Sequence, residues 1–484
     1  MDLNYKDLFK SLNNGQNFNG DVMKKLDINK IDLSVTRKIN KLKAMENCIL
    51  PLYIEGDEVI VLVASSEDSK LNKNELEFLY NKKIKAIISD KDYVVNLINN
   101  VFLGEDENLL DKIVEEAIMT NASDIHFEPQ KNDILIRIRI DGILISYGKI
   151  TELEYQRLLS RIKVLGNMDI TERRRPQDGK STITIISKVY DLRISTIPIT
   201  YGEKLVIRIL YGEVFCHDLK TLNMTMDQRE RLNKIIALKN GLVLVNGPTG
   251  SGKSTTLYSI LKEINRGEVN ITTLEDPVEV LIKGVNQVSL NRKANITFAN
   301  GLRSILRQDP DILMIGEIRD EETASLVVTA SLTGHKVYST IHTKTPREVY
   351  YRLEDMGIKQ YLIKDSIVGI ISQRLIRVLC NECKEVDKEL IFRNRKVKAF
   401  KKKGCKLCNY TGYKGRTVVS SVVYIDDKIK KIISNIYQEI IELSNYEMIS
   451  NLEDLFIKGD ITYLDYNNFL LEEGLNYEEN KIII

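Results

Sequence analysis

The 484-residue chain contains no tryptophan, and none of its apolar runs approaches the roughly 18–20 residues that a membrane-spanning helix requires. Its charges nearly cancel, with 70 Lys and Arg against 68 Asp and Glu, so no overall field favours DNA or RNA as a partner. The opening residues, Met-Asp-Leu-Asn-Tyr-Lys, lack the basic and apolar regions of a signal peptide. We therefore expect a cytoplasmic protein, long enough for about three domains.

A phosphate-binding motif lies at residues 246–256, which read Asn-Gly-Pro-Thr-Gly-Ser-Gly-Lys-Ser-Thr-Thr. The apolar run 242–245 before it predicts a buried parallel strand, and the apolar spacing over 254–264 predicts a helix. Glycines let backbone N–H groups turn toward phosphates, Lys253 bridges the terminal phosphates, and the Ser254 hydroxyl ligates Mg²⁺. The motif predicts a site for ATP and Mg²⁺ formed by Gly247, Pro248, Thr249, Gly250, Ser251, Gly252, Lys253, Ser254 and Thr255.

Acidic residues follow two further strand patterns of this region. The strands predicted at 271–274, 312–315 and 337–342 alternate with helical patterns, which is typical of a parallel α/β core. Ligands bind at the carboxyl ends of such strands, so we expect these residues on the phosphate side. Glu317 is the candidate to orient or deprotonate the attacking water, and a solvated strand-end charge is the alternative. Glu275 and Glu279 are candidates to hold the Mg²⁺ water shell or the nucleophile.

Two histidines flank the last of these strands. His342 is predicted to sense the γ-phosphate, whereas His335 could equally be a satisfied loop histidine. An extended segment of seven residues spans more than about 20 Å at roughly 3.3 Å per residue. We therefore do not expect His335 and His342 to share one metal ion unless the chain folds back.

Four of the six cysteines form two Cys-x-x-Cys pairs, Cys380 with Cys383 and Cys405 with Cys408. In a reducing compartment this arrangement favours a metal over disulfides, and four thiolates suit tetrahedral Zn²⁺. Redox pairs or free thiols are the alternative. The basic stretch 393–406 between the pairs is interpreted as a solvated loop, or else as a surface for an acidic partner or a membrane.

The first half of the chain predicts two smaller modules. Residues 1–40 are polar and predict a mobile or small helical start. Strand patterns on either side of 55–57, a helix at 74–81 and a strand at 85–88 then predict a small α/β module. A second, α+β domain is predicted from a helix at 109–120, a hairpin with its turn at Asp141-Gly142, and strands at 182–187, 190–196 and 205–210. Residues 211–226 are expected to connect it to the nucleotide domain.

Taken together, these motifs resemble the secretion ATPase superfamily, specifically the assembly ATPases of type II secretion and type IV pili. Gly316 before Glu317 is this family's own form of the Walker B motif, and Ser372-Gln373-Arg374-Leu375 leads into the first cysteine pair as in the family. The resemblance covers roughly residues 105–420 and is weaker over 40–100. It is carried by an aspartate box at 271–279, a Walker B region at 302–324, a histidine box at 333–343, and upstream matches at 122–129, 137–142, 173–179 and 191–208.

The resemblance implies a homohexamer that drives an inner-membrane platform protein from the inner face of the cell membrane. It carries Arg193 and Arg208 over as the arginines that reach the phosphates, and strand-face arginines paired with surface acids are the alternative. The implied fold is a RecA-like P-loop ATPase core preceded by a PAS-like α+β domain. The expected regions are a partner-docking first N-terminal domain (1–104), the second N-terminal domain (105–213), the RecA-like domain (214–379), a zinc-binding insertion (380–416) and a C-terminal helical region (417–484).

Two stretches depart from the family pattern. The first forty residues lack the Arg-Leu-Gly-type opening with which some members bind cyclic di-GMP, so we do not expect that ligand. Val418-Val419-Ser420-Ser421 stands where the family usually has an aromatic-Glu pair. This second departure concerns a contact at the base of the zinc module.

The sequence leaves three other functions open. The first is a RecA-like nucleic-acid translocase, although no DNA- or RNA-binding module is recognisable and no nucleic-acid partner is expected. The second is a retraction-type secretion ATPase, although the resemblance places the zinc module in assembly motors. The third is a nucleotide-sensing scaffold that does not hydrolyse ATP.

Overall fold

The computed structural model describes residues 30–64, 72–102, 108–211, 218–426 and 436–475. The chain divides into two compact units, Met1–Leu210 and Tyr211–Ile484, which we describe one at a time. Most of residues 1–40, on which the expectations of a mobile start and of no cyclic di-GMP rest, lie outside the described residues. Within the described residues no helix combines the length and the hydropathy needed to cross a bilayer.

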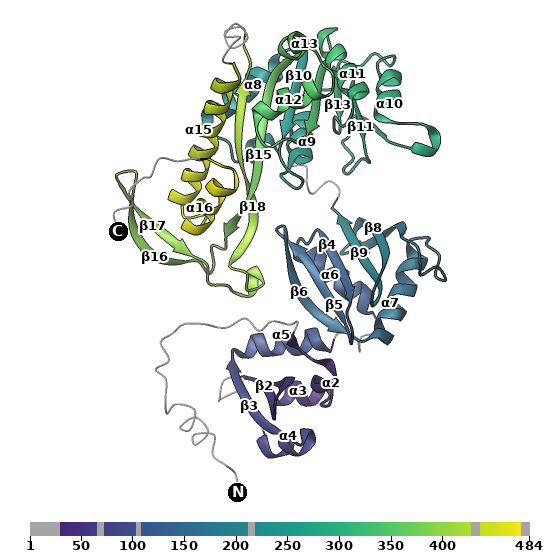
Figure 1. Cartoon of the computed structure of the whole chain (residues 1–484), viewed down its shortest axis with the longest axis vertical. Coiled ribbons are helices and arrows are strands. Elements are labelled where there is room, and N and C mark those ends of the chain that lie inside the picture. The colour runs from purple at the N-terminus through teal and green to yellow at the C-terminus, as the bar shows by residue number, and fades with distance from the viewer. Residues whose placement is uncertain (1–29, 65–71, 103–107, 212–217, 427–435, 476–484) are drawn as a thin grey trace. The chain divides into compact units, whose positions relative to one another are not determined.

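The small module of the first unit is a three-stranded sheet in the order β1-β2-β3 with helices packed against it (Figure 1). β1 and β2 are antiparallel and meet at the predicted turn around Gly56, whereas β3 runs parallel to β2. Leu50, Leu62 and Ile98 are among its buried apolar side chains. Its elements are α2 (Leu33–Thr36), α3 (Lys41–Asn47), β1 (Ile49–Glu55), β2 (Glu58–Ala64), α4 (Lys73–Tyr80), β3 (Lys83–Ser89) and α5 (Lys91–Val101).

The second domain of this unit is a six-stranded sheet in the order β6-β5-β4-β9-β8-β7, in which every pair of neighbours is antiparallel. One face of the sheet is apolar and packs against helices, as the stacking of Phe127 on Tyr155 shows. The predicted hairpin and the three later strands are present, although β7 begins five residues before the predicted strand at 182–187 and ends before residues 186–187, which form a turn. The elements are α6 (Leu109–Met119), β4 (Asp124–Pro129), β5 (Ile134–Ile140), β6 (Ile143–Ile150), α7 (Glu152–Leu165), β7 (Gln177–Ile185), β8 (Lys188–Ile199) and β9 (Gly202–Leu210).

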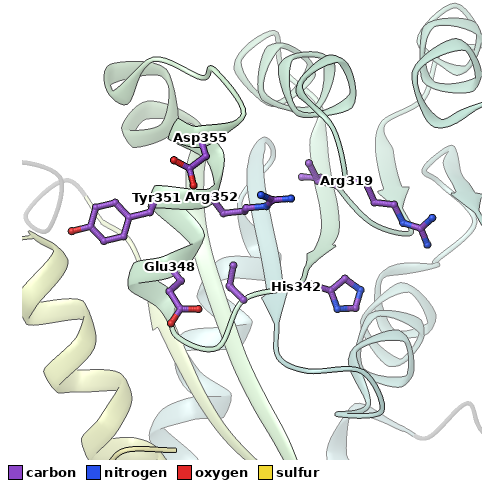
Figure 2. A pocket seen from close by; sticks show the side chains of 8 residues that line it. Arg319, His342, Glu348, Tyr351, Arg352 and Asp355 are labelled. Atoms are coloured by element: carbon purple, nitrogen blue, oxygen red, sulfur yellow. The ribbon is translucent and has the colours of Figure 1, made fainter.

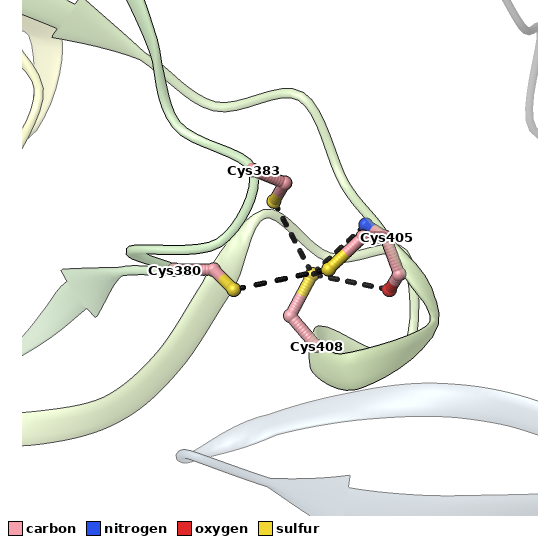
Figure 3. A group of neighbouring side chains, drawn as sticks. All are labelled: Cys380, Cys383, Cys405 and Cys408. Carbon is pink, nitrogen blue, oxygen red and sulfur yellow. Dashed lines mark hydrogen bonds between the residues drawn. The ribbon is translucent and has the colours of Figure 1, made fainter.

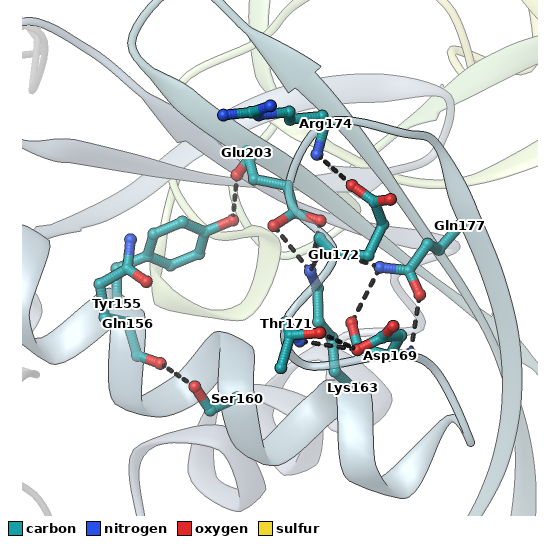
Figure 4. Close-up of polar contacts among 10 residues, drawn as sticks. All are labelled: Tyr155, Gln156, Ser160, Lys163, Asp169, Thr171, Glu172, Arg174, Gln177 and Glu203. Carbon is teal, nitrogen blue, oxygen red and sulfur yellow. Dashed lines mark hydrogen bonds and ion pairs between the residues drawn. The ribbon is translucent and has the colours of Figure 1, made fainter.

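A polar network ties the segment between α7 and β7 to the rest of this domain (Figure 4). The buried Lys163 Nζ donates to the Glu203 carboxylate at 2.8 Å and to the Glu172 carbonyl at 2.7 Å. Gln177, the first residue of β7, donates to the carbonyls of Asp169 and Glu172. These bonds fix where β7 begins and therefore the register of its exposed side chains.

The second unit is built on a seven-stranded sheet in the order β12-β11-β13-β14-β10-β15-β18. All neighbouring pairs are parallel except β15 and β18, so the carboxyl ends of β10, β11, β13 and β14 meet at one edge. The predicted strands at 242–245, 271–274, 312–315 and 337–342 are confirmed to within one residue at each end. The strands are β10 (Gly241–Asn246), β11 (Ile271–Glu275), β12 (Asn286–Ser289), β13 (Ile312–Ile315), β14 (Lys336–Ile341), β15 (Ile367–Leu379) and β18 (Tyr413–Tyr424).

Helices cover both faces of this sheet because its central strands are apolar on both sides. Leu242 and Leu244 of β10 belong to the core cluster on one face, and Val243 and Val245 belong to the cluster on the other. This alternation confirms the predicted parallel α/β core. The helices are α8 (Met226–Ala237), α9 (Lys253–Ile264), α10 (Phe298–Ile305), α11 (Glu321–Leu332), α12 (Pro346–Asp355) and α13 (Gln360–Ser366).

Residues 395–401 of the basic stretch 393–406 form the second strand of a hairpin and not part of a solvated loop. β16 (Glu385–Phe392) and β17 (Arg395–Lys401) pair antiparallel. Val397 and Ala399 alternate with the basic residues of β17 and are buried in a core shared with Phe456 and Tyr466. The latter two lie on α15 (Ile436–Ile457) and α16 (Tyr463–Glu472). The lysines occupy the outward positions, so the basic composition hides an amphipathic strand.

Candidate nucleotide and metal sites

The phosphate loop connects β10 to α9 and depends on glycine at its first turn. Gly247 has a φ of 152°, and a Cβ there would lie 2.5 Å from the Gln373 carbonyl oxygen and 2.6 Å from Ser251 Oγ. Gly250 and Gly252 have φ values of 78° and 86°. L-residues rarely adopt these conformations, so the glycines of the motif are required by the backbone itself.

Lys253 lies inside the curl of this loop at the start of α9. Its Nζ donates to the carbonyls of Gly247 and Pro248, both at 2.9 Å, and the residue is buried. Burial lowers the pKa of Lys253, while the negative charge of Glu317 opposes that shift. A buried ammonium group held by carbonyls alone keeps its charge available for an anion, which is the role the sequence predicts.

Two residues of β15 brace the loop from the neighbouring strand. Gln373 Nε2 donates to the Ser251 carbonyl at 2.7 Å, and Ser372 Oγ donates to Asn246 Oδ1. Both pairs join residues more than 100 positions apart, so periodicity and spacing give no sign of them. The resemblance includes Gln373 without giving it a function, and its bracing contact comes from the structure.

Glu317 lies just after β13, at the same edge of the sheet, between a histidine and an arginine. One carboxylate oxygen lies 3.4 Å from His342 Nε2, and the other forms an ion pair with Arg319. Burial lowers the pKa of His342, and the positive charge of Lys253 lowers it further. The electrostatic effects among Lys253, Glu317 and His342 show that the fold brings these three predicted residues together.

Arg319 is a site residue that sequence reasoning missed. It also lies 3.7 Å from Asp276 after β11, and so links the ends of two strands. Its position two residues after Glu317 is the one signal that could have found it. Arg319 and His342 line a cavity of about 400 Å³ whose other wall is α12, with Glu348, Tyr351, Arg352 and Asp355 around it (Figure 2).

The two other predicted carboxylates lie in different surroundings. Glu275 is buried at the end of β11, where it accepts hydrogen bonds from Tyr258, Thr273 and Gln287. Burial raises its pKa, and these hydrogen bonds oppose the shift. Glu279 is exposed, with its backbone N–H directed at Tyr258 Oη. Tyr258 thus connects both acids to the helix that follows the phosphate loop.

His335 is a satisfied loop histidine, which is one of the two readings that the sequence left open. Its backbone N–H and its ring Nδ1 both lie 3.1 Å from the Ala330 carbonyl at the end of α11. Among the described residues, His335 and His342 do not belong to a common group of metal-ligating side chains.

Arg193 and Arg208 lie side by side on β8 and β9 of the first unit. Arg208 forms an ion pair with the buried Asp124 at 2.8 Å. Because Asp124 is buried, this is not the surface acid of the alternative, and the Arg208 guanidinium is still largely exposed. The contact of Arg208 with phosphates stays a prediction. No carboxylate of the described residues pairs with Arg193.

The four predicted cysteine ligands converge at the base of the β16–β17 hairpin (Figure 3). Their Sγ atoms all lie within 4.8 Å of one another, and three pairs are 3.8–3.9 Å apart. A tetrahedral Zn²⁺ with bonds of about 2.3 Å places its sulfurs roughly 3.8 Å apart. The N–H groups of Gly404, Cys405 and Gly412 point at two of the sulfurs, as thiolate ligands require. The arrangement therefore fits structural zinc.

Comparison with known proteins adds to this geometry. Residues 103–463 match the family described as Type II/IV secretion system protein, and residues 24–108 match the MshEN domain. The chain is 44% identical over 333 residues to the type II secretion system ATPase E of Vibrio cholerae, an alignment that covers 67% of this chain and 66% of that relative. It is 40% identical over 334 residues to the type IV pilus assembly ATPase PilB of Thermus thermophilus, covering 67% of this chain and 38% of that relative.

A solved structure supports the same assignment of the fold. The pilus retraction motor PilT with bound ADP matches with a TM-score of 0.50 and 26% identity, covering 74% of this chain and 96% of that one. The seven-stranded sheet of the second unit is thus the RecA-like core that the resemblance implied. The chain has a phosphate loop, Glu317 at the carboxyl edge of the sheet and a group of four cysteines, and it belongs to the type II/IV secretion system protein family, the family of the secretion ATPases.

Proposed function

We propose that the chain is an ATP-hydrolysing motor that powers the assembly of type IV pili or of type II secretion pseudopili. The observation that best supports this proposal is the meeting of Lys253, Glu317 and His342 at the carboxyl edge of one parallel sheet. Phosphoryl transfer needs a cation for the phosphates and a carboxylate for the water, and little other covalent chemistry.

Each residue has a defined task in this proposal. The loop N–H groups and Lys253 bind the phosphates, and the exposed Ser254 hydroxyl in the first turn of α9 holds Mg²⁺. Glu317 accepts a hydrogen bond from the attacking water and orients it. His342, neutral because its pKa is lowered, donates to Glu317 or to the γ-phosphate. Glu275 and Glu279 do not ligate Mg²⁺ directly and instead hold the water molecules around it.

The motor works as a homohexamer at the inner face of the membrane, on an inner-membrane platform protein. The names of the Vibrio and Thermus relatives support secretion and pilus assembly equally. In this proposal the small module docks a partner, and the second N-terminal domain supplies Arg193 and Arg208 to the phosphates. ATP binding and product release change the conformation of the motor in turn.

The test is ATP hydrolysis by the purified full-length chain. Glu317→Gln and Lys253→Ala are each expected to lower kcat by about a thousandfold or more, because they remove the water-orienting and phosphate-binding groups. Glu322→Gln and Lys262→Ala are matched controls, since both residues are exposed on α11 and α9. Turnover near the wild-type rate in Glu317→Gln would remove that residue from the mechanism.

The same preparation separates the rival functions. Stimulation of ATP hydrolysis by DNA would favour the nucleic-acid translocase. Tight ATP binding without any phosphate release from the wild-type chain would favour the non-hydrolysing scaffold. Loss of pilus retraction with assembly intact, in cells that carry Lys253→Ala, would favour the retraction motor.

Zinc has a structural task in this proposal, because it joins the start of β16 to the start of β18. A structural zinc site contributes on the order of 10 kcal/mol to the folding of a small module. A chelator is therefore expected to raise amide hydrogen exchange over 380–412 by orders of magnitude and to release one zinc per chain. Metal analysis of protein purified without chelators that finds no zinc would end this assignment.

A further inference from the structure

One row of charged side chains crosses the six-stranded sheet of the first unit. Strand pairing places Lys180 of β7 opposite Arg193 of β8, and Arg193 opposite Arg208 of β9. Arg208 lies opposite Asp124 of β4. Side chains opposite one another in neighbouring strands share a face, with Cβ atoms about 5 Å apart. Three adjacent cations thus extend over roughly 10 Å, with one carboxylate at the end of the row.

This row lies on the face of the sheet that is not apolar. Ile194 and Ile207, which alternate with the arginines along β8 and β9, are buried on the opposite face. Lys180 and Arg208 are exposed, and Arg193 is half-buried. Like charges placed opposite one another destabilise a sheet, so folding alone gives no reason for three cations in register.

The charges of the row are compensated at one end only. Asp124 is buried, accepts from Arg208 Nε at 2.8 Å and lies 3.7 Å from Arg139 Nε. Its pKa stays low, because the hydrogen bonds from Arg208 and Ser123 outweigh its burial. In the described part of the chain, no carboxylate forms an ion pair with Lys180 or Arg193. Asp124 therefore holds Arg208 in place and leaves the other two cations unneutralised.

The three cations line one cavity of about 570 Å³. Its wall also includes Gly166, Gly179 and Ser195, and the only acid among its lining residues is Asp178. Gly179 has no room for a side chain, since a Cβ would lie 2.5 Å from the Gly166 carbonyl oxygen. The network around Lys163 and Gln177 fixes the start of β7, three residues before Lys180 (Figure 4). The cavity is therefore cationic, and hydrogen bonds fix the start of the strand that carries Lys180.

We propose that Lys180, Arg193 and Arg208 form one linear binding site for a polyphosphate chain, in which Lys180 contacts phosphate directly and Asp124 positions Arg208. The proposal deepens the proposed function, because the polyphosphate it fits is the triphosphate of ATP. It adds a third cation to the two arginines and assigns the buried carboxylate a task. Charge-assisted bonds to phosphate from Lys and Arg are strong enough to make each cation measurable.

Calorimetric titration with inorganic tripolyphosphate tests this site apart from catalysis. The full-length chain carries Lys253→Ala, so the phosphate loop no longer contributes its cation. We expect saturable binding that weakens about tenfold when Lys180→Gln or Arg193→Gln is added. Lys188→Gln is the matched control, since Lys188 is exposed on β8 but, five residues before Arg193, lies on the opposite face. Equal losses in Lys180→Gln and Lys188→Gln, or no binding at all, would overturn the proposal.

Asp124 is tested by rescue. Asp124→Ala is expected to weaken tripolyphosphate binding about tenfold in the same background, because Arg208 loses its anchor, and Asp124→Glu is expected to restore most of the affinity. Adding Arg208→Gln to Asp124→Ala should then cause little further loss. Independent, additive losses would show that Asp124 does not act through Arg208. The melting temperature of each variant reports separately on folding.

The two proposals fail in different ways. If the wild-type chain hydrolyses no ATP but the Lys253→Ala chain binds tripolyphosphate through Lys180, the motor is wrong and the phosphate row stands. If ATP is hydrolysed but Lys180→Gln changes neither tripolyphosphate binding nor the KM for ATP, the proposed phosphate-binding row is wrong and the proposed motor function is unaffected.

Discussion

A glycine and a buried lysine lie together at each end of β10, but the two lysines have different surroundings. At its amino end Gly241 pairs with Lys336, and at its carboxyl end Gly247 begins the loop that encloses Lys253. Both lysines are buried, with exposed fractions of 2% and 8%, and both donate to backbone carbonyls. Lys253 interacts with the negative charge of Glu317, whereas burial alone governs Lys336 and lowers its pKa to about 8.

The difference separates the lysine that we propose binds phosphate from a lysine whose contacts are structural. Lys336 Nζ donates to the Ile235 carbonyl at the end of α8 and lies 5.8 Å from the ring of Tyr338. It therefore ties α8 to the sheet. Lys253 lies at the edge where four parallel strands end, which is where α/β sheets bind ligands.

The first prediction tests the difference between the two ends of β10 by adding a methyl group at each glycine. Gly247→Ala is expected to weaken nucleotide binding at least about a hundredfold, because losing two charge-assisted phosphate bonds costs about 3–6 kcal/mol. Gly241→Ala is the control, since its Cβ would meet the Val368 side chain and leave the loop intact. It should lower the melting temperature and keep nucleotide affinity. Titration with fluorescent ATP measures both, and a wild-type affinity in Gly247→Ala would contradict the loop geometry.

The second prediction concerns the amino end alone. The folded-state pKa of Lys336 lies below its unfolded value of 10.5, so the protonated lysine destabilises the fold below about pH 8. Stability recovers as the pH rises through the window between 8 and 10.5. Lys336→Met should therefore raise the free energy of unfolding at neutral pH, by at most about 3 kcal/mol.

Thermal unfolding of the wild-type chain and of Lys336→Met across this pH range measures the effect. The gain should shrink toward zero near the upper end of the window, and nucleotide affinity should not change. A gain independent of pH would show that packing, and not the buried charge, accounts for it.

A third, smaller effect is expected at the brace of the loop. Gln373→Met keeps the volume of the side chain but removes the hydrogen bond to the Ser251 carbonyl. We expect nucleotide affinity to fall about tenfold, the equivalent of one hydrogen bond of about 1.4 kcal/mol. The melting temperature distinguishes this from unfolding, and an unchanged affinity would show that the loop holds its shape without β15.

The smallest expected effect is at His342. Because its pKa is lowered, the imidazole is neutral at neutral pH and gains a charge only as the pH falls. Protonation would tighten its pairing with Glu317 and so hinder that carboxylate as the acceptor for water. His342→Gln should lower kcat only about threefold at neutral pH and should flatten the acid side of the profile. A profile with an unchanged acid side would assign that titration to another group.

Local patterns in the sequence were enough to predict the phosphate loop and four strands of the nucleotide domain, β10, β11, β13 and β14. The apolar runs at 242–245 and 312–315 are buried on both faces, so composition alone marks them as central strands. Glu317 and His342 follow such strands directly, and the parallel sheet brings their ends together. For these residues, sequence order and spatial position are linked by simple geometry.

Other parts of the site could not be predicted, because they depend on contacts distant in sequence. Gln373 reaches the loop across 122 positions, and Asp124 reaches Arg208 across 84. The hairpin at 385–401 was hidden for another reason. Only Leu390, Phe392, Val397 and Ala399 face its core, and the lysines between them give the segment the composition of a loop.

β15 joins the two chemical centres of the second unit into one stiff piece. Gln373 near its middle supports the phosphate loop, and its last residue, Leu379, precedes the first cysteine of the tetracysteine cluster. Residues 374–379, between Gln373 and the first cysteine, span about 20 Å of strand, and they pair with the antiparallel strand β18. A displacement of the tetracysteine cluster would therefore be transmitted along β15 to the phosphate loop. In the same way, a change of the loop on nucleotide binding would be transmitted to the cluster.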